Sequence, residues 1–320
     1  GEPRIDFSND AKGALKLEPQ RSNLYAYSED FSNADWTKSS ATVAITSNVS
    51  PDGTTNSVYN LTGTNANLYT GGTTGVEYTV SVYAKSNGQG KDNFKLRLGN
   101  SISSSITVTD EWVRYEFTGT PTTNVFGLTV DGSPNNEWDI LIWGAQLEQG
   151  SYATSYIPTQ GSAVTRSADV CNNGGNEQVI NSTEGVLYAE ISALTEDSGD
   201  SRRLTISDGT TNNRVSFELD ETEGLIKLFF TGNGSLNQLT TTIDVSADFK
   251  IAASYNSSSL KLYVNGIKEG EDTSITLPIG LDNLSFDSGT GSSDFYGNVK
   301  DVRVYNTALT DQELINLTTI

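Results

Sequence analysis

The sequence contains no histidine, no methionine and a single cysteine among its 320 residues. Without histidine the chain lacks the commonest general base near neutral pH and the commonest zinc ligand, which excludes Ser-His-Asp, Cys-His and histidine-metal mechanisms. Cys171 has no partner for an internal disulfide and no histidine to activate it, so we interpret it as a buried or linker thiol. Any catalysis would have to use carboxylates, tyrosine, lysine or arginine.

Positive charge is also scarce, because 20 Lys and Arg stand against 40 Asp and Glu, a net charge of −20. Such a chain repels phosphate backbones and anionic lipid headgroups, so neither nucleic acid nor a membrane is an expected partner. No apolar run approaches the ~20 residues of a membrane span, and the start GEPRIDFSND lacks the basic and apolar parts of a signal peptide. Since the chain begins with Gly1, we expect it to be a segment of a longer protein.

Short segments that alternate apolar and polar residues recur along the whole chain, separated by clusters of Gly, Asn, Asp and Ser. This pattern is typical of β-sandwiches. The predicted strands are 78–85, 94–98, 112–117 and 126–130 in the first half and 186–194, 203–206, 214–219, 225–230, 250–255, 260–264 and 299–305 in the second. The one predicted helix is 311–317, which Thr310 can cap with Glu313 at capping-box spacing.

The chain therefore reads as all-β, with two tandem β-sandwich (jelly-roll) domains and a short C-terminal helix. Prolines and glycines interrupt the strand pattern after residue 157, and all four tryptophans precede that point. We predict an N-terminal tail over 1–19, a first domain over 20–158, a linker over 159–176 and a second domain over 177–320.

Two short motifs bracket the first domain. Its opening, Leu17-Glu-Pro-Gln-Arg-Ser-Asn-Leu24 with Tyr27-Ser-Glu-Asp-Phe31, and its ending, Trp143-Gly-Ala-Gln-Leu-Glu-Gln-Gly150 with Ala153–Pro158, resemble modules of bacteriophage virion and tail-fibre proteins. The strand layout between them is similar to carbohydrate-binding modules of the 4/9 type. In those modules a Glu and an Asp hold a structural calcium, but Ser32 and Trp143-Gly144 stand at the corresponding places here.

The second domain resembles concanavalin A-like or laminin G-like jelly rolls. The resemblance rests on Leu260-Lys-Leu-Tyr-Val-Asn-Gly266 and on the closing segment Asp301–Leu314. That fold hosts lectins, adhesion domains, glycosidases and lyases, so it does not fix a function. The acidic loops 197–200 and 287–294 offer oxygen ligands that Ca²⁺ prefers, although neither has the spacing of an EF-hand. They are interpreted either as calcium sites or as metal-free turns, in which Asp, Gly and Ser are the usual residues.

One segment matches a catalytic pattern. Glu218-Leu-Asp-Glu-Thr-Glu223 satisfies the E-x-D-x-x-E motif of family-16 glycoside hydrolases, in which two carboxylates act as nucleophile and acid. In that family the motif lies along one strand with apolar residues interleaved, and here only Leu219 is interleaved. We interpret 220–224 as the polar turn of a hairpin and predict no catalytic residues.

A sugar site in a β-sandwich needs an aromatic ring and fixed polar groups. If the polar faces of the four predicted strands in the first domain line one concave sheet, they form a basic groove suited to an acidic polysaccharide. The proposed carbohydrate-binding residues are Tyr83, Lys85, Arg97, Trp112, Arg114 and Asp131, with Lys95, Glu116 and Thr129 beside them. The alternative is a solvated face with cross-strand ion pairs.

The remaining aromatic and polar candidates are weaker. Trp36 and Trp138 fit either a sugar-contacting role or a place in the core, and Trp143 is assigned to packing. The polar face of the second domain is expected to present Glu190, Arg203, Thr205, Arg214, Ser216 and Glu218, with no exposed aromatic residue.

The leading hypothesis is a non-catalytic glycan-binding protein on the surface of a phage virion, attaching to host polysaccharide and contacting other virion proteins. Several weak sites on a particle would act together. The alternatives are a polysaccharide hydrolase or lyase, and a purely structural decoration of the virion.

Overall fold

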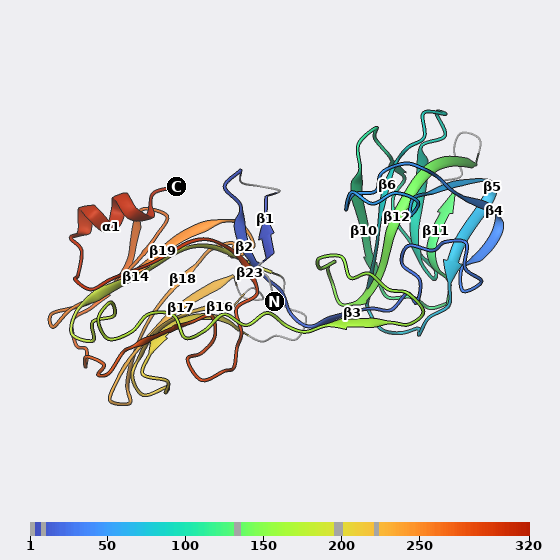
Figure 1. Ribbon diagram of the computed structural model, residues 1–320. Helices are drawn as coiled ribbons and strands as arrows, with labels where there is room; N and C mark the ends of the chain where they lie inside the picture. Colours follow the sequence, from blue (N-terminus) through green and yellow to red (C-terminus); the bar gives the residue numbers. More distant parts are fainter. Residues whose placement is uncertain (1–3, 8–10, 131–135, 195–200, 221–223) are drawn as a thin grey trace. The chain divides into compact units, whose positions relative to one another are not determined.

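The computed structural model describes residues 4–7, 11–130, 136–194, 201–220 and 224–320 (Figure 1). The chain divides into two compact units, which we call the first sandwich (residues 20–167) and the second sandwich (residues 1–19 with 168–320). Within these described residues the regular structure is all β-strand apart from one short helix, so the predicted fold class is confirmed. No helix in the described part of the chain is long and apolar enough to cross a membrane.

The first sandwich is built on a nine-stranded sheet, with β10, β6, β12, β5, β11, β7 and β8 in order, β4 on β5 and β9 on β7. The nine strands are β4 (Thr37–Ile45), β5 (Tyr59–Thr70), β6 (Tyr78–Ser86), β7 (Asn93–Leu98), β8 (Ser101–Ile102), β9 (Ile106–Thr107), β10 (Val113–Gly119), β11 (Phe126–Val130) and β12 (Glu137–Gln149). A separate pair is formed by β3 (Arg21–Asn23) and β13 (Val164–Arg166). The sheet folds back on itself. This is seen where the ring of Phe94 on β7 packs edge-on against the ring of Tyr115 on β10, with 5.7 Å between the ring centres. The outer faces of β6–β10 and of β7–β11 therefore point in opposite directions.

A buried asparagine ties the opening of the first sandwich to its ending. The Asn23 side chain is fully buried and donates to the carbonyl oxygens of Ala145 (3.1 Å) and Ile157 (2.8 Å). Its carbonyl oxygen accepts from the backbone N–H groups of Tyr25 (3.2 Å) and Leu147 (3.1 Å). The two motifs that carry the family resemblance thus meet at one polar side chain.

The second sandwich has two sheets with an apolar core between them. The seven-stranded sheet runs β1 (Arg4–Asp6), β2 (Ala14–Leu17), β23 (Gly297–Tyr305), β14 (Gly185–Ala193), β19 (Phe249–Tyr255), β20 (Leu260–Val264) and β21 (Ile267–Asp272). The five-stranded sheet runs β18 (Ser235–Thr242), β17 (Leu225–Gly232), β16 (Arg214–Asp220), β15 (Arg202–Ser207) and β22 (Asn283–Ser285). Asn233-Gly234 and Asn265-Gly266 adopt positive φ in tight turns, as Asn-Gly pairs predict.

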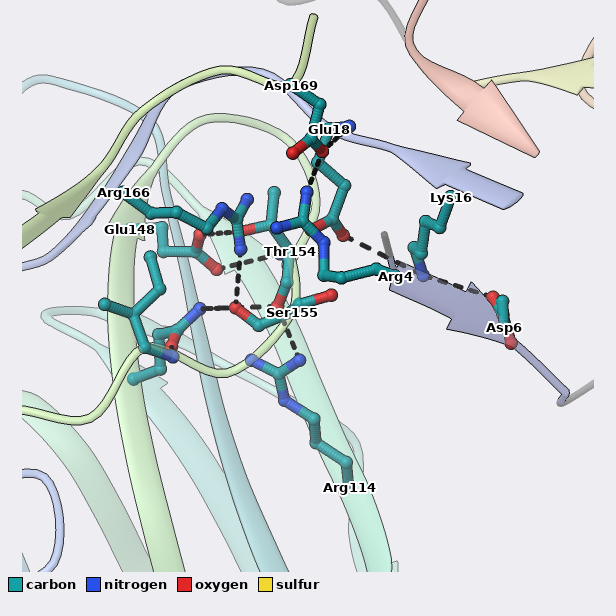
Figure 2. A network of polar contacts seen from close by, with 12 residues as sticks. Arg4, Asp6, Lys16, Glu18, Arg114, Glu148, Thr154, Ser155, Arg166 and Asp169 are labelled. Atoms are coloured by element: carbon teal, nitrogen blue, oxygen red, sulfur yellow. Dashed lines mark hydrogen bonds and ion pairs between the residues drawn. The ribbon is translucent and has the colours of Figure 1, made fainter. Parts of the chain in front are cut away.

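The segment expected to be an N-terminal tail is instead part of the second sandwich. Strand β2 pairs with β23, and β1 pairs with β2. Figure 2 shows Arg4 reaching Glu18 and Asp169, while the backbone N–H of Glu18 donates to the Asp169 carboxylate at 2.7 Å. The expected linker over 159–176 is also divided: β13 pairs with β3 of the first sandwich, and the second sandwich resumes at Ala168. Strands of three or four residues show almost no alternation, so only their pairing partners define them.

Helix α1 (Asp311–Thr318, red in Figure 1) covers part of the outer face of the seven-stranded sheet. Its Leu314 is buried against Val186, Tyr188 and Tyr263. Thr310 is the N-cap, and Glu313 completes the predicted capping box.

Replacing Thr310 by alanine should lower the stability of the second sandwich by about 1 kcal/mol, the usual effect of losing an N-cap side chain. Hydrogen exchange of the amides in 311–318 measures the loss directly, and we expect faster exchange in that helix. Thr273→Ala, an exposed loop threonine, is the matched control. Equal protection of α1 in both variants would contradict the capping role.

Candidate functional site

The proposed sugar-binding residues of the first sandwich do not form one groove. Tyr83 and Arg114 are direct cross-strand neighbours on β6 and β10. Figure 2 shows the Arg114 guanidinium directed at the carbonyl of Thr154, to which Nη1 donates at 2.6 Å, and Nη2 donates to the Ser81 hydroxyl at 2.9 Å. Arg114 therefore fixes the segment that follows β12.

Tyr83 packs in a small aromatic cluster under that same segment. Its ring lies 5.4 Å from Trp143 and 6.3 Å from Tyr156, and the guanidinium of Arg114 lies 5.7 Å from its centre. Trp143 is 3% exposed, which confirms its assignment to packing, and Trp36 and Trp138 are core residues. The expected solvent-facing side of β6 is thus largely covered by residues 150–158.

Lys85 and Trp112 remain half-exposed beside this cluster. The Lys85 ammonium lies 6.0 Å from the centre of the indole, and the indole N–H donates to the carbonyl of Val49 at 2.9 Å. Trp112 is the one tryptophan of the four that is not buried.

The other predicted residues lie elsewhere. Arg97 and Lys95 are on β7, whose outer face points away from β6 and β10, and Arg97 Nε donates to the carbonyl of Gly99 at 2.8 Å. Asp131 lies outside the described residues. The single groove expected from the sequence is therefore wrong, because the sheet folds back between the two pairs of strands.

A second cluster of charged and aromatic residues lies on the outer face of the five-stranded sheet. The strand register aligns Arg203, Glu218 and Lys227 in one row across β15, β16 and β17. The next row aligns Thr205, Ser216 and Phe229, and Arg214 follows on β16. We call Arg203, Arg214, Glu218, Lys227 and Phe229 the basic face.

The charged side chains of the basic face differ in whether they have a partner of opposite charge. Glu218 is 4% exposed, and its two carboxylate oxygens are engaged by Arg203 and by Lys227, the latter at 3.0 Å. Arg214 forms no ion pair within the described residues, and its Nη1 donates to the carbonyl of Ser288 at 3.2 Å. Burial and the neighbouring charge of Arg203 lower the pKa of Arg214, although arginine stays charged at neutral pH. Lys227 also lies 3.6 Å from Asp220, so three cations face two carboxylates and the cluster keeps an excess of positive charge in a strongly acidic chain.

Phe229 is the functional candidate that sequence reasoning missed. Its half-exposed ring lies 5.1 Å from the guanidinium of Arg203 and 5.8 Å from that of Arg214. These contacts hold two planar guanidinium groups over one ring. The signal was present in the sequence: Ile226, Leu228 and Phe230 fill the inner face, so the intervening Phe229 must face outward.

The loop after β22 covers part of this sheet. Thr205 Oγ1 donates to the carbonyl of Asp287 at 2.6 Å, and Asp287 Oδ1 accepts from Ser285 Oγ at 2.8 Å and from the Gly289 N–H at 2.5 Å. The Oδ1 atom of Asp287 therefore stabilises the turn in which Asp287 itself lies. In the described residues no group of three His, Cys, Asp or Glu side chains gathers to hold a metal ion, and the loop 197–200 lies outside them. A calcium site and metal-free turns both stay sequence-based alternatives.

Three further predictions meet different outcomes. Glu190 was expected on the same face as Arg203 and Glu218, but it lies on β14 in the other sheet. The prediction failed because alternation within a strand does not show which sheet the strand joins.

Strands β16 and β17 pair as the expected hairpin, with Glu221–Glu223 outside the described residues. Cys171 is half-buried against the core, and burial raises the pKa of its thiol.

Comparison with known families supports the reading of the second sandwich. Residues 193–315 match the model of the concanavalin A-like lectin/glucanases superfamily. This match contains all five residues of the basic face, and it confirms the concanavalin A-like part of the expected resemblance. No curated protein matches the chain.

Solved structures with partial similarity include three proteins. The CBM40 of the Ruminococcus gnavus IT-sialidase has a TM-score of 0.39 at 16% identity, covering 48% of this chain and 96% of that one; it has also been solved bound to α2,3-sialyllactose. A SAP-like pentraxin from Limulus polyphemus has a TM-score of 0.35 at 12% identity, covering 45% and 72%. The NanB sialidase from Streptococcus pneumoniae has a TM-score of 0.37 at 17% identity, covering 44% of this chain and 24% of the sialidase.

Proposed function

We propose that this protein is a non-catalytic glycan-binding module, and that the basic face of the second sandwich binds an acidic saccharide. The observation that carries the proposal is Arg214, a half-buried arginine without a carboxylate partner within the described residues, stacked near Phe229 in a lectin-like sheet. A guanidinium offers paired donors that match the geometry of a carboxylate. A saccharide carboxylate would supply the charge that the basic face lacks.

In this proposal the module attaches a phage virion to polysaccharide on the host surface. The phage setting is supported by the resemblance of the two motifs that bracket the first sandwich. Multiple copies on one particle would compensate for modest affinity at each site, because linked sites bind with a high effective concentration.

The non-catalytic part of the proposal is supported by Glu218. Both of its oxygens are already engaged by Arg203 and Lys227, which leaves no free carboxylate oxygen at the centre of the face for attack on a sugar. Depolymerisation of a bound polysaccharide by the wild-type chain, lost in Glu218→Gln, would instead establish a hydrolase or lyase.

Arg214→Gln tests the binding site. We expect at least tenfold weaker binding of sialic acid- and uronic acid-bearing oligosaccharides, because one charge-assisted contact of about 1.4 kcal/mol corresponds to a factor of ten. Isothermal titration calorimetry on the full chain measures the change. Arg303→Gln is the matched control, since this exposed arginine lies on the other sheet. If the wild-type chain bound no saccharide on a glycan array, the structural-decoration alternative would replace this proposal.

A further inference from the structure

A cavity of about 420 Å³ lies in the first sandwich, away from the strands on which the sequence placed a sugar site. Three segments of the chain form it: 27–30, 56–59 and 158–160. The volume is within the roughly 300–1,000 Å³ range of small-ligand pockets. Its lining combines two tyrosine rings, two carboxylates and two side-chain amides: Tyr27, Tyr59, Glu29, Asp30, Asn56 and Gln160.

Several polar groups of this lining have capacity for a ligand. Glu29 uses one carboxylate oxygen, which accepts from the Tyr156 hydroxyl at 3.0 Å, and its second oxygen has no hydrogen-bond partner among the described residues. The hydroxyl of Tyr27 and the side-chain amides of Asn56 and Gln160 likewise form no hydrogen bond within the part of the chain that the structure describes. A saccharide needs this mixture of acceptors, donors and a ring face.

The charge of the cavity is negative. Asp30 accepts from the Ser32 hydroxyl at 2.5 Å and from Tyr59 at 2.9 Å, and the bond from Ser32 lowers the pKa of this carboxyl. Burial raises the pKa of Glu29, with a contribution from the charge of Asp52. No lysine or arginine is among the described residues that line the cavity. The nearby Lys38 ammonium interacts with the charge of Asp30 but donates its hydrogen bonds to three backbone carbonyl groups.

We propose that this cavity is a second saccharide site, and that it takes a sugar unit bearing a protonated amine. The ammonium group lies against Glu29 and Asp30, the hydroxyl groups meet Asn56 and Gln160, and the ring packs on Tyr27. Two lining carboxylates, with no lysine or arginine among the described lining residues, disfavour an acidic sugar here, so the site has a charge preference opposite to that of the basic face. The inference does not depend on the proposed function, because the two sites lie in different sandwiches.

Titration calorimetry of the full chain at pH 6.5 tests the cavity with D-glucosamine, N-acetyl-D-glucosamine and D-glucuronic acid. We expect glucosamine to bind at least tenfold more tightly than its N-acetyl form, which has the same ring without the charge. Glu29→Gln should weaken glucosamine binding at least tenfold while keeping an oxygen to accept from Tyr156. Glu111→Gln, an exposed carboxylate of the same sandwich, is the matched control and should change nothing.

Three results would overturn the proposal: no saturable glucosamine binding, equal binding of the two hexosamines, or unchanged binding in Glu29→Gln. If Glu29→Gln alters tryptophan fluorescence and so has lost its fold, Asn56→Gly on the exposed rim takes its place, because glycine tolerates the positive φ there, and it should weaken binding severalfold. Arg214→Gln should leave glucosamine binding intact. The proposal for the cavity and the proposal for the basic face can therefore each fail without the other.

Discussion

Replacing Asn23 by alanine should lower the free energy of unfolding of the first sandwich by about 4 kcal/mol or more, because a buried hydrogen-bonding group left without a partner costs roughly 1–3 kcal/mol. The substitution leaves four such groups, which are the carbonyls of Ala145 and Ile157 and the N–H groups of Tyr25 and Leu147. The side chain is fully buried, so water cannot easily replace it. The expected loss is a large fraction of the stability of a typical domain.

Urea unfolding followed by tryptophan fluorescence measures this change specifically. All four tryptophans lie in the first sandwich, so the signal reports on that unit alone. Asn124→Ala, an exposed asparagine of the same sandwich, is the control and should shift the midpoint little. Equal midpoints for the two variants would show that Asn23 does not join the two ends of the sandwich.

Glu218→Gln should destabilise the second sandwich by about 3 kcal/mol. Removing one partner of a buried ion pair typically costs roughly 3–5 kcal/mol, and the lower end applies because Arg203 and Lys227 keep partial contact with solvent. The glutamine preserves the size of the side chain, so the effect reports the loss of charge among three cations.

A double-mutant cycle separates this charge effect from packing. Adding Arg203→Gln to Glu218→Gln should recover part of the lost stability, because it removes one of the uncompensated charges. Calorimetric unfolding of the full chain provides the measurement, and Glu177→Gln, an exposed carboxylate in the same sandwich, provides the control. A double variant less stable than the sum of its single variants would contradict the electrostatic explanation.

Each of the eleven strands predicted from local alternation corresponds to a strand of the structure, which has 23 strands in the described residues. The predicted strands 78–85, 94–98 and 214–219 agree with β6, β7 and β16 to within a residue at each end. Alternation is visible within a single strand because successive side chains point to opposite faces. Among the strands that were missed are β4, β5 and β18, whose polar residues interrupt the alternation.

The candidate sites were harder to predict, for two different reasons. Tyr83 and Arg114 were correctly placed on one face, but residues 150–158 return over that face, and this return depends on contacts distant in sequence. The cavity around Glu29 joins three segments, none of which shows a motif of its own. Phe229 was predictable, since the apolar residues on either side of it already fix its direction.

The sequence by itself determined the all-β class, the Asn-Gly turns, the capped C-terminal helix and an acidic chain without histidine chemistry, because each follows from residues close together or from composition. Only the tertiary structure decided that β1 and β2 join the second sandwich, that the predicted groove of the first is divided, and that Arg214 lies among cations while Glu29 lies beside a second carboxylate. The physical reason is that burial of a polar face depends on which distant segment covers it, and local alternation carries no information about that segment.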